Sequence, residues 1–108
     1  MKEIDDVRII RLLVDAIMFE NYEEIFNRIK VAINEDYNRI VLDLEKVTFM
    51  DSISLGMLVP LLLYTRRMEG EMAVASLKPN IRDLFETLRL DKIISVYADT
   101  DDAVAHLR

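Results

Sequence analysis

An acid and two hydroxyls lie between two apolar runs in the segment VTFMDSISLGMLVP, residues 47–60. Asp51 and Ser52 stand where a loop ends and an apolar helix is predicted to begin. The first N–H groups of a helix have no partners inside it, and its dipole favours negative charge there. We therefore predict that Ser52 caps this helix, a role worth about 1 kcal/mol. Modification of the Ser52 hydroxyl by another protein is the second interpretation, and the turn alone does not require it.

Other residues that could do chemistry are scarce. His106 is the sole histidine and lies near the C-terminus, where we expect a solvated helix end rather than a general base. With two glycines and no cysteine, the chain has neither a Gly-rich phosphate loop nor a thiolate site. Asp43 follows a buried strand, as in phospho-accepting receiver domains, but such a site also needs an acidic pair, and Asp15 stands alone. We expect no catalytic residue, no metal and no cofactor.

Composition limits the function further. The 108 residues suffice for one domain, predicted over 1–108, and 52% of them are hydrophobic. The longest apolar stretch, Leu55–Leu63, is far shorter than the roughly 20 residues of a membrane span. The N-terminus lacks the apolar core of a signal peptide, so we expect a cytoplasmic protein that does not bind membranes. A net charge of −6 argues against nucleic acid as a partner.

Strand and helix patterns alternate along the chain. Apolar runs predict strands at 7–14, 39–44, 71–77 and 93–97, and helical spacing predicts helices at 22–34, at 55–68, from Pro79 and from Thr100. The run Ile-Val-Leu at 40–42 is typical of a strand covered on both faces. This β-α-β-α-β-α-β-α order indicates an α/β fold with a largely parallel sheet.

Several residues are predicted to set where the helices start, stop or bend. Asn21 and Glu24 resemble a capping box, and Thr100 is placed to cap the last helix. Gly70 is expected to end the 55–68 helix in a left-handed conformation. Pro60 lacks an N–H, so a kink or a widened turn is expected at 56–60. The predicted core residues are Ile40, Leu42, Leu44, Leu55, Val59, Leu62, Leu84 and Phe85.

Three segments together resemble the STAS domain family, and within it the bacterial anti-sigma factor antagonists: IVLDLEKVTFMDSISLG, GEMAVASLKPNIRDLFETLRLDKII and DTDDAVAHL. They cover about residues 39–107. The resemblance implies a single STAS-like domain, a mostly parallel mixed sheet with about four α-helices packed on it. The N-terminal half is less similar: only 1–4 remains for a first strand, and Leu-Val-Asp-Ala-Ile at 13–17 replaces the Gly-Glu-Leu-Asp-like turn of the family.

The family pattern Asp-Ser-Ser-Gly-Leu-Gly matches this chain at Asp51, Ser52, Leu55 and Gly56, and Ile53 and Ser54 depart from it. By resemblance, the phosphorylated serine is Ser52, with Ser54 as a competing acceptor. The resemblance also implies a partner-binding surface, which comprises Asp51, Ser52, Ile53, Ser54, Leu55, Gly56 and Met57.

The resemblance implies partner switching. When unphosphorylated, the protein would bind an anti-sigma factor that is itself a serine kinase, and phosphorylation would release it. The ATP would belong to the partner, so the chain would not be an enzyme, and we expect a monomer or a weak dimer. The alternative is a non-switching scaffold or regulatory subunit of a stress-sensing or transporter-associated assembly.

Overall fold

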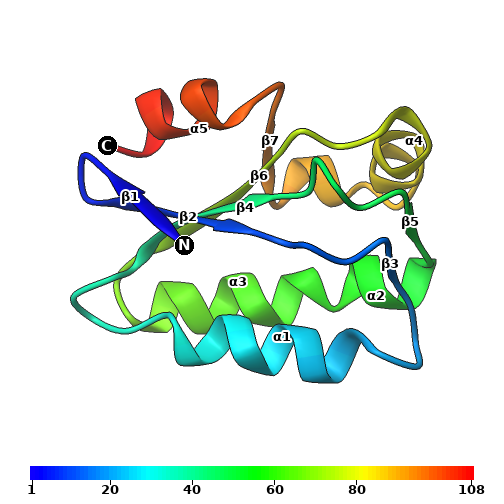
Figure 1. Ribbon diagram of the computed structural model, residues 1–108, viewed down its shortest axis with the longest axis horizontal. Coiled ribbons are helices and arrows are strands. Elements are labelled where there is room, and N and C mark those ends of the chain that lie inside the picture. The colour runs from blue at the N-terminus through cyan, green and yellow to red at the C-terminus, as the bar shows by residue number, and fades with distance from the viewer.

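A five-stranded sheet forms the centre of the structure, a computed structural model that describes residues 1–108 (Figure 1). Its spatial order is β1 (Lys2–Ile4), β2 (Val7–Arg11), β4 (Arg39–Asp43), β6 (Glu71–Ala75) and β7 (Ser95–Tyr97). β1 and β2 form an antiparallel hairpin, and every other neighbouring pair is parallel. The predicted α/β fold with a mostly parallel mixed sheet is confirmed.

Helices cover both faces of this sheet (Figure 1). On one face lie α1 (Tyr22–Val31) and α3 (Leu58–Arg67), and on the other lies α5 (Thr100–Leu107). α4 (Pro79–Thr87) packs at one end of the sheet, and a short 3₁₀ helix, η1 (Leu90–Lys92), connects it to β7. Ile40 and Leu42 of β4 point into the larger core towards α1 and α3, whereas Val41 points into the smaller core under α5. The prediction that this strand is covered on both faces is therefore confirmed.

A second, two-stranded parallel sheet consists of β3 (Ala16–Ile17) and β5 (Phe49–Met50). It leads directly into α2 (Ser52–Gly56) (Figure 1). The sequence predicted neither strand, because two residues are too few to show a period. The predicted 7–14 strand ends at Arg11, and the chain then turns away from the main sheet into β3.

The 55–68 helix is divided as predicted from Pro60. α2 ends at Gly56, Met57 forms a turn, and α3 begins at Leu58. Pro60 lies four residues after Gly56, whose carbonyl its ring would crowd in a regular helix, and the break at Met57 falls between these two residues. Six of the eight predicted core residues are buried; Val59 and Leu84 are only partly buried.

Two predicted helix caps are wrong. Asn21 makes no cap hydrogen bond; instead its Oδ1 accepts from Met18 N–H at 2.7 Å and its Nδ2 donates to Ala16 C=O at 3.0 Å. Asn21 therefore fixes the loop between β3 and α1 rather than the helix start. At α5, Asp99 is the cap, since its carboxylate accepts from Asp102 N–H at 2.8 Å, and the helix begins one residue later. The prediction that a helix starts at Pro79 is confirmed.

Gly70 has a different role from the predicted one. The left-handed residue after α3 is Glu69, with φ 61°, and Gly70 has no positive φ. Glycine is required here for space, because a Cβ on residue 70 would lie 1.9 Å from the carbonyl oxygen of Asn38. The chain after α3 therefore packs directly against the chain that enters β4.

The core predicts a large cost for removing the ring of Phe85, which is completely buried. Phe85→Ala should lower the free energy of unfolding by about 3 to 5 kcal/mol in chemical denaturation, since it leaves a cavity. Phe19→Ala is the matched control, because that ring is 61% exposed. Equal losses in the two variants would contradict the packing of α4 described above.

Candidate functional site

Asp51 begins α2, and its carboxylate joins two segments of the chain. Its backbone is extended, with φ −84° and ψ 171°, and Oδ1 accepts from Ser54 N–H at 2.8 Å. Asp51 is therefore the N-cap, and the prediction that Ser52 caps the helix is wrong. Oδ2 accepts from Phe19 N–H at 2.9 Å, across 32 positions of sequence. One side chain thus holds both the first turn of α2 and the loop that precedes α1.

These contacts keep the Asp51 carboxyl ionised. Desolvation alone would raise its pKa, but hydrogen bonds from the backbone N–H groups of Ser54 and Phe19 outweigh it. The pKa of Asp51 consequently lies below its ordinary value of 3.8. At neutral pH a full negative charge stands beside the first residue of α2.

The two serines of α2 have opposite environments. Ser52 is the first helical residue, and its side chain is exposed. Ser54 is completely buried, and its Oγ lies 2.8 Å from Ile17 C=O and 3.0 Å from Asp51 C=O. The Ser54 hydroxyl therefore ties α2 to β3 and is buried, so it would have to leave this contact before it could act as the competing acceptor that the sequence predicts. Of these two hydroxyls, only that of Ser52 is accessible.

Several apolar side chains close to Asp51 in the chain, or in the loop that Asp51 binds, are exposed. Ile53 is 50% exposed, Phe49 in β5 is 47% exposed, and Phe19 is 61% exposed beside its hydrogen bond to Asp51. Within the predicted partner surface, Gly56 and Met57 are partly exposed, whereas Leu55 is completely buried and belongs to the core. Sequence reasoning missed Phe19 and Phe49. A phenylalanine among polar residues in Met-Phe-Glu-Asn at 18–21 was the available signal for Phe19.

The remaining candidates have structural partners. Asp43 lies 3.3 Å from Arg11 Nε and accepts from Glu45 N–H at 3.0 Å, whereas Asp15 Oδ1 accepts from Thr48 Oγ1 at 2.8 Å. His106 stacks on a tyrosine ring at 4.7 Å and stays largely exposed on α5, as predicted. No three His, Cys, Asp or Glu side chains gather where they could share a metal ion. None of the helices has the length and apolar character that crossing a membrane requires.

The sheet is mostly parallel and begins with an antiparallel hairpin, and an exposed serine, Ser52, starts α2. These features together define a class of small α/β domains. The chain belongs to the STAS domain family, whose family model matches residues 1–103.

Individual relatives of this chain are described as bacterial anti-sigma factor antagonists. A Bordetella bronchiseptica protein described as an anti-sigma factor antagonist is 26% identical over 105 residues, which is 97% of this chain and 90% of the relative. The crystal structure of a Thermotoga maritima protein with the same description superimposes with a TM-score of 0.85 at 28% identity. That match covers 99% of this chain and 92% of the other.

More distant structures share the fold. The Bacillus cell fate determinant SpoIIAA in its phosphorylated form has a TM-score of 0.69 at 21% identity, covering 100% of this chain and 96% of the other. The murine anion transporter Slc26a9 has a TM-score of 0.83 at 16% identity, with 98% of this chain covered but only 18% of the transporter. The fold therefore occurs both as a small separate protein and as part of a transporter.

The dual hydrogen bonding of Asp51 predicts a selective effect of Asp51→Asn. The amide can still accept from Ser54 N–H, but its NH₂ group would face Phe19 N–H. We expect faster amide hydrogen exchange at Phe19 and a loss of about 1 kcal/mol of stability at neutral pH. The pKa of Asp51 in the folded protein lies below its ordinary value of 3.8. The extra stability of the wild type over Asp51→Asn should therefore be fully present at pH values above 3.8 and should disappear as the pH falls through the folded-state pKa.

Ser52→Ala is the control for this prediction, because Ser52 is not the cap. Its stability should stay within about 0.5 kcal/mol of the wild type. A loss for Ser52→Ala as large as that for Asp51→Asn would show that the cap has been assigned to the wrong residue.

Proposed function

We propose that this protein is an anti-sigma factor antagonist that switches partners through phosphorylation of Ser52. Unphosphorylated, it binds an anti-sigma factor that is also a serine kinase, and the sigma factor is released. The kinase transfers the γ-phosphoryl group of its own ATP to the Ser52 Oγ, ADP leaves, and a base of the kinase takes up the hydroxyl proton. The phosphorylated protein then dissociates. It acts in transcription regulation in the bacterial cytoplasm and is not itself an enzyme.

The observation that carries this proposal is the accessibility of Ser52 beside a buried, hydrogen-bonded Ser54. A kinase must reach the hydroxyl oxygen, and Ser54 would have to break its contact with β3 before it could react. Ser52 sits on the first turn of a helix, where phosphorylation leaves the core untouched. These contacts favour Ser52 over Ser54 as the modified residue.

The charge of the phosphate explains how the complex would separate. Phosphoserine adds roughly 1.5 to 2 negative charges at neutral pH. Those charges would stand next to the ionised Asp51 and the exposed side chain of Ile53, its two neighbours in the chain. In solution, water screens this repulsion. In an interface the phosphate would have to be desolvated beside a like charge, which destabilises the complex without destabilising the domain.

The relatives support this proposal. The Bordetella and Thermotoga proteins are both described as anti-sigma factor antagonists, and each is matched along most of its length. SpoIIAA, which has the same fold, has been solved in a phosphorylated form. A protein of this fold can therefore carry a phosphate and remain folded.

We propose a revised partner-binding surface on the same side of the molecule. It keeps Asp51, Ser52, Ile53, Gly56 and Met57 as contact residues. Phe19 and Phe49 are added, because both rings are exposed, Phe19 N–H binds the Asp51 carboxylate, Phe49 lies two residues before Asp51, and aromatic side chains supply much of the binding energy of interfaces. Ser54 and Leu55 support this surface from below.

A scaffold function remains the second candidate, because the fold also occurs within the Slc26a9 transporter. In that case the domain would bind its assembly permanently, and Ser52 would be an ordinary exposed residue. The two functions differ in one observable property, the transfer of phosphate.

Phosphate transfer can be tested directly. The purified protein is incubated with ATP and each anti-sigma factor kinase of its host, and the products are mapped by peptide mass spectrometry. We expect phosphate on Ser52 with every kinase that binds, no phosphate on Ser52→Ala, and phosphate still on Ser52 in Ser54→Gly. Ser52→Asp should fold normally and bind the kinase weakly. If no kinase modifies Ser52, partner switching is excluded and the scaffold function takes its place.

The aromatic part of the surface gives a separate prediction. In its unphosphorylated form, the Phe19→Ala variant should bind the kinase about tenfold more weakly than the wild type does. Isothermal titration calorimetry measures this affinity. Val31→Ala is the matched control, since Val31 is 84% exposed but lies at the opposite end of α1. Equal affinities of Phe19→Ala and the wild type would remove Phe19 from the surface.

A further inference from the structure

β2 has a free backbone edge beyond the end of β1. The pairing of β1 with β2 stops at Lys2, opposite Ile9. The N–H group of Leu12 points towards β4, where it donates to the carbonyl of Asp43 at 3.1 Å. Because successive residues of a strand direct their N–H and C=O groups to opposite sides, those of Arg11 and Leu13 point away from β4, towards the side on which β1 lies. Leu13 has no backbone hydrogen bond at all. An edge of this kind can pair with another extended chain.

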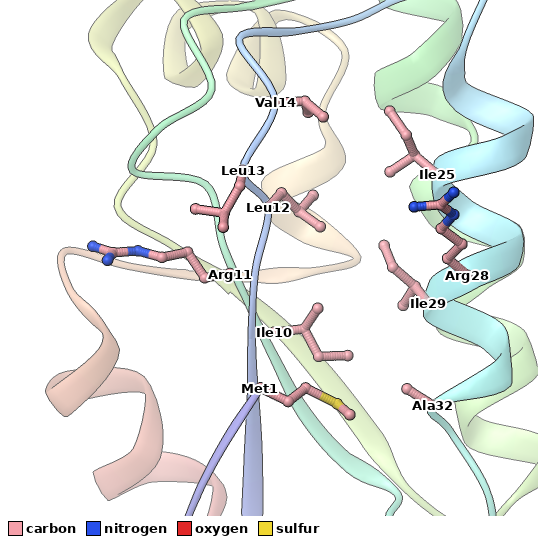
Figure 2. Close-up of a pocket in the computed structure, with 10 residues that line it drawn as sticks. All are labelled: Met1, Ile10, Arg11, Leu12, Leu13, Val14, Ile25, Arg28, Ile29 and Ala32. Atoms are coloured by element: carbon pink, nitrogen blue, oxygen red, sulfur yellow. The ribbon is translucent and has the colours of Figure 1, made fainter.

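A groove of about 390 Å³ runs between this edge and α1. Figure 2 shows Ile10, Leu12 and Val14 facing Ile25, Ile29 and Ala32 across it, while Arg11 and Leu13 point to the other side of the strand. Eight of the ten residues that line the groove are hydrophobic. The groove therefore combines an apolar floor with unpaired main-chain groups along one wall.

The charge of the groove is opposite to that of the protein. The chain carries a net charge of −6, yet the two charged residues that line the groove are both arginines, Arg11 and Arg28. Arg11 already lies between Asp43 and Glu45. Arg28 has one exposed helical ion pair with Glu24, at 3.3 Å, and its side chain is 82% exposed. Arg28 is thus available to a carboxylate from outside.

We infer that this groove binds an extended acidic segment of a partner protein, which joins the sheet as a strand antiparallel to β2 and in line with β1. Its main chain would pair with Arg11 and Leu13. Alternate side chains, apolar in character, would point between β2 and α1, and a carboxylate would reach Arg28. Strand addition of this kind takes affinity from main-chain hydrogen bonds and specificity from alternate side-chain pockets.

A peptide fits these features better than a lipid does. A fatty acid would fill the apolar floor and could pair with Arg28, but it has no groups for the N–H and C=O of Leu13. The groove also shares no lining residue with the proposed Ser52 surface, which is made of β5, α2 and the loop before α1. This inference is therefore independent of partner switching.

The test begins with selection of short random peptides, displayed in a library, on the immobilised protein. Selected peptides are synthesised and titrated into ¹⁵N-labelled protein. We expect enriched sequences with alternating apolar residues and at least one Asp or Glu. Amide shifts should change at residues 10–14 and along 25–32 of α1, with little change at α2.

Two variants separate the contribution of main-chain pairing from that of the Arg28 charge. Leu13→Pro removes a backbone N–H that the fold does not use, and Arg28→Glu reverses the charge at the groove; each should weaken the selected peptides by about tenfold. Arg82→Glu is the matched control, because Arg82 forms a similar exposed helical pair with Glu86 at 3.4 Å on α4. Its affinity should equal that of the wild type, and thermal unfolding checks that all three variants are folded.

Three results would overturn the inference. The library could yield no enriched peptide, the selected peptides could shift residues of α2 instead of the groove, or Arg28→Glu and Leu13→Pro could both bind like the wild type. Sodium decanoate serves as a second probe. If it shifts residues 10–14 and 25–32 and no peptide does, the groove belongs to a small amphiphile rather than to a protein strand.

Discussion

Two backbone N–H groups from distant parts of the chain share one carboxylate, and the proposed partner-binding surface depends on that arrangement. Asp51 binds Ser54 N–H within α2 and Phe19 N–H in the loop before α1. The buried Ser54 hydroxyl adds a contact to β3 from beneath. The start of α2, the second sheet and the 18–21 loop therefore form one fixed unit, and Ser52 is held exposed at a defined place on it.

The position of that unit follows from the burial of β4. Because Ile40 and Leu42 fill one core and Val41 fills the other, β4 can neither slide nor turn over without exposing apolar side chains. Its carboxyl end fixes where the chain leaves for β5 and α2. Parallel pairing with β2 brings the carboxyl end of that strand to the same edge, so β3 can meet β5 there. The site lies at the edge where ligand sites of parallel sheets are usual.

The order of elements was predictable because burial imposes a period on the sequence. The apolar run of β4 and the helical stripe around Phe85 show that period clearly, and Pro60 marks a break that needs no tertiary information. The predictions at Asn21, Gly70 and Thr100 were wrong for a common reason. Each residue type fits a local helix-end rule, but its actual partner or obstacle, as with Gly70 and the Asn38 carbonyl, is set by packing.

The site was predictable only in part, for the same reason. Sequence similarity located Asp51 and Ser52, but the opposite exposure of Ser52 and Ser54 depends on how α2 sits on β3. The sequence around Phe19 suggests an exposed aromatic ring, but it does not place that residue beside Asp51, which is 32 positions away and is reached only through the loop that Asn21 fixes. Two-residue strands such as β3 and β5 have no periodic signal at all.

The proposed switch acts through charge, and the structure explains why no change of fold is needed. Phosphorylation of Ser52 would break no hydrogen bond inside the domain. Asp51 would keep its contacts with the N–H groups of Ser54 and Phe19, and Ser54 would keep its bond to β3. The added charge acts mainly on the partner protein that faces Ser52 in the complex, since water screens it on the free domain.

The groove along β2 lies against the middle and end of α1, whereas the Ser52 surface reaches only the loop before that helix. The two surfaces share no residue, so we expect that both partners can be bound by the same molecule and that phosphorylation releases only one of them.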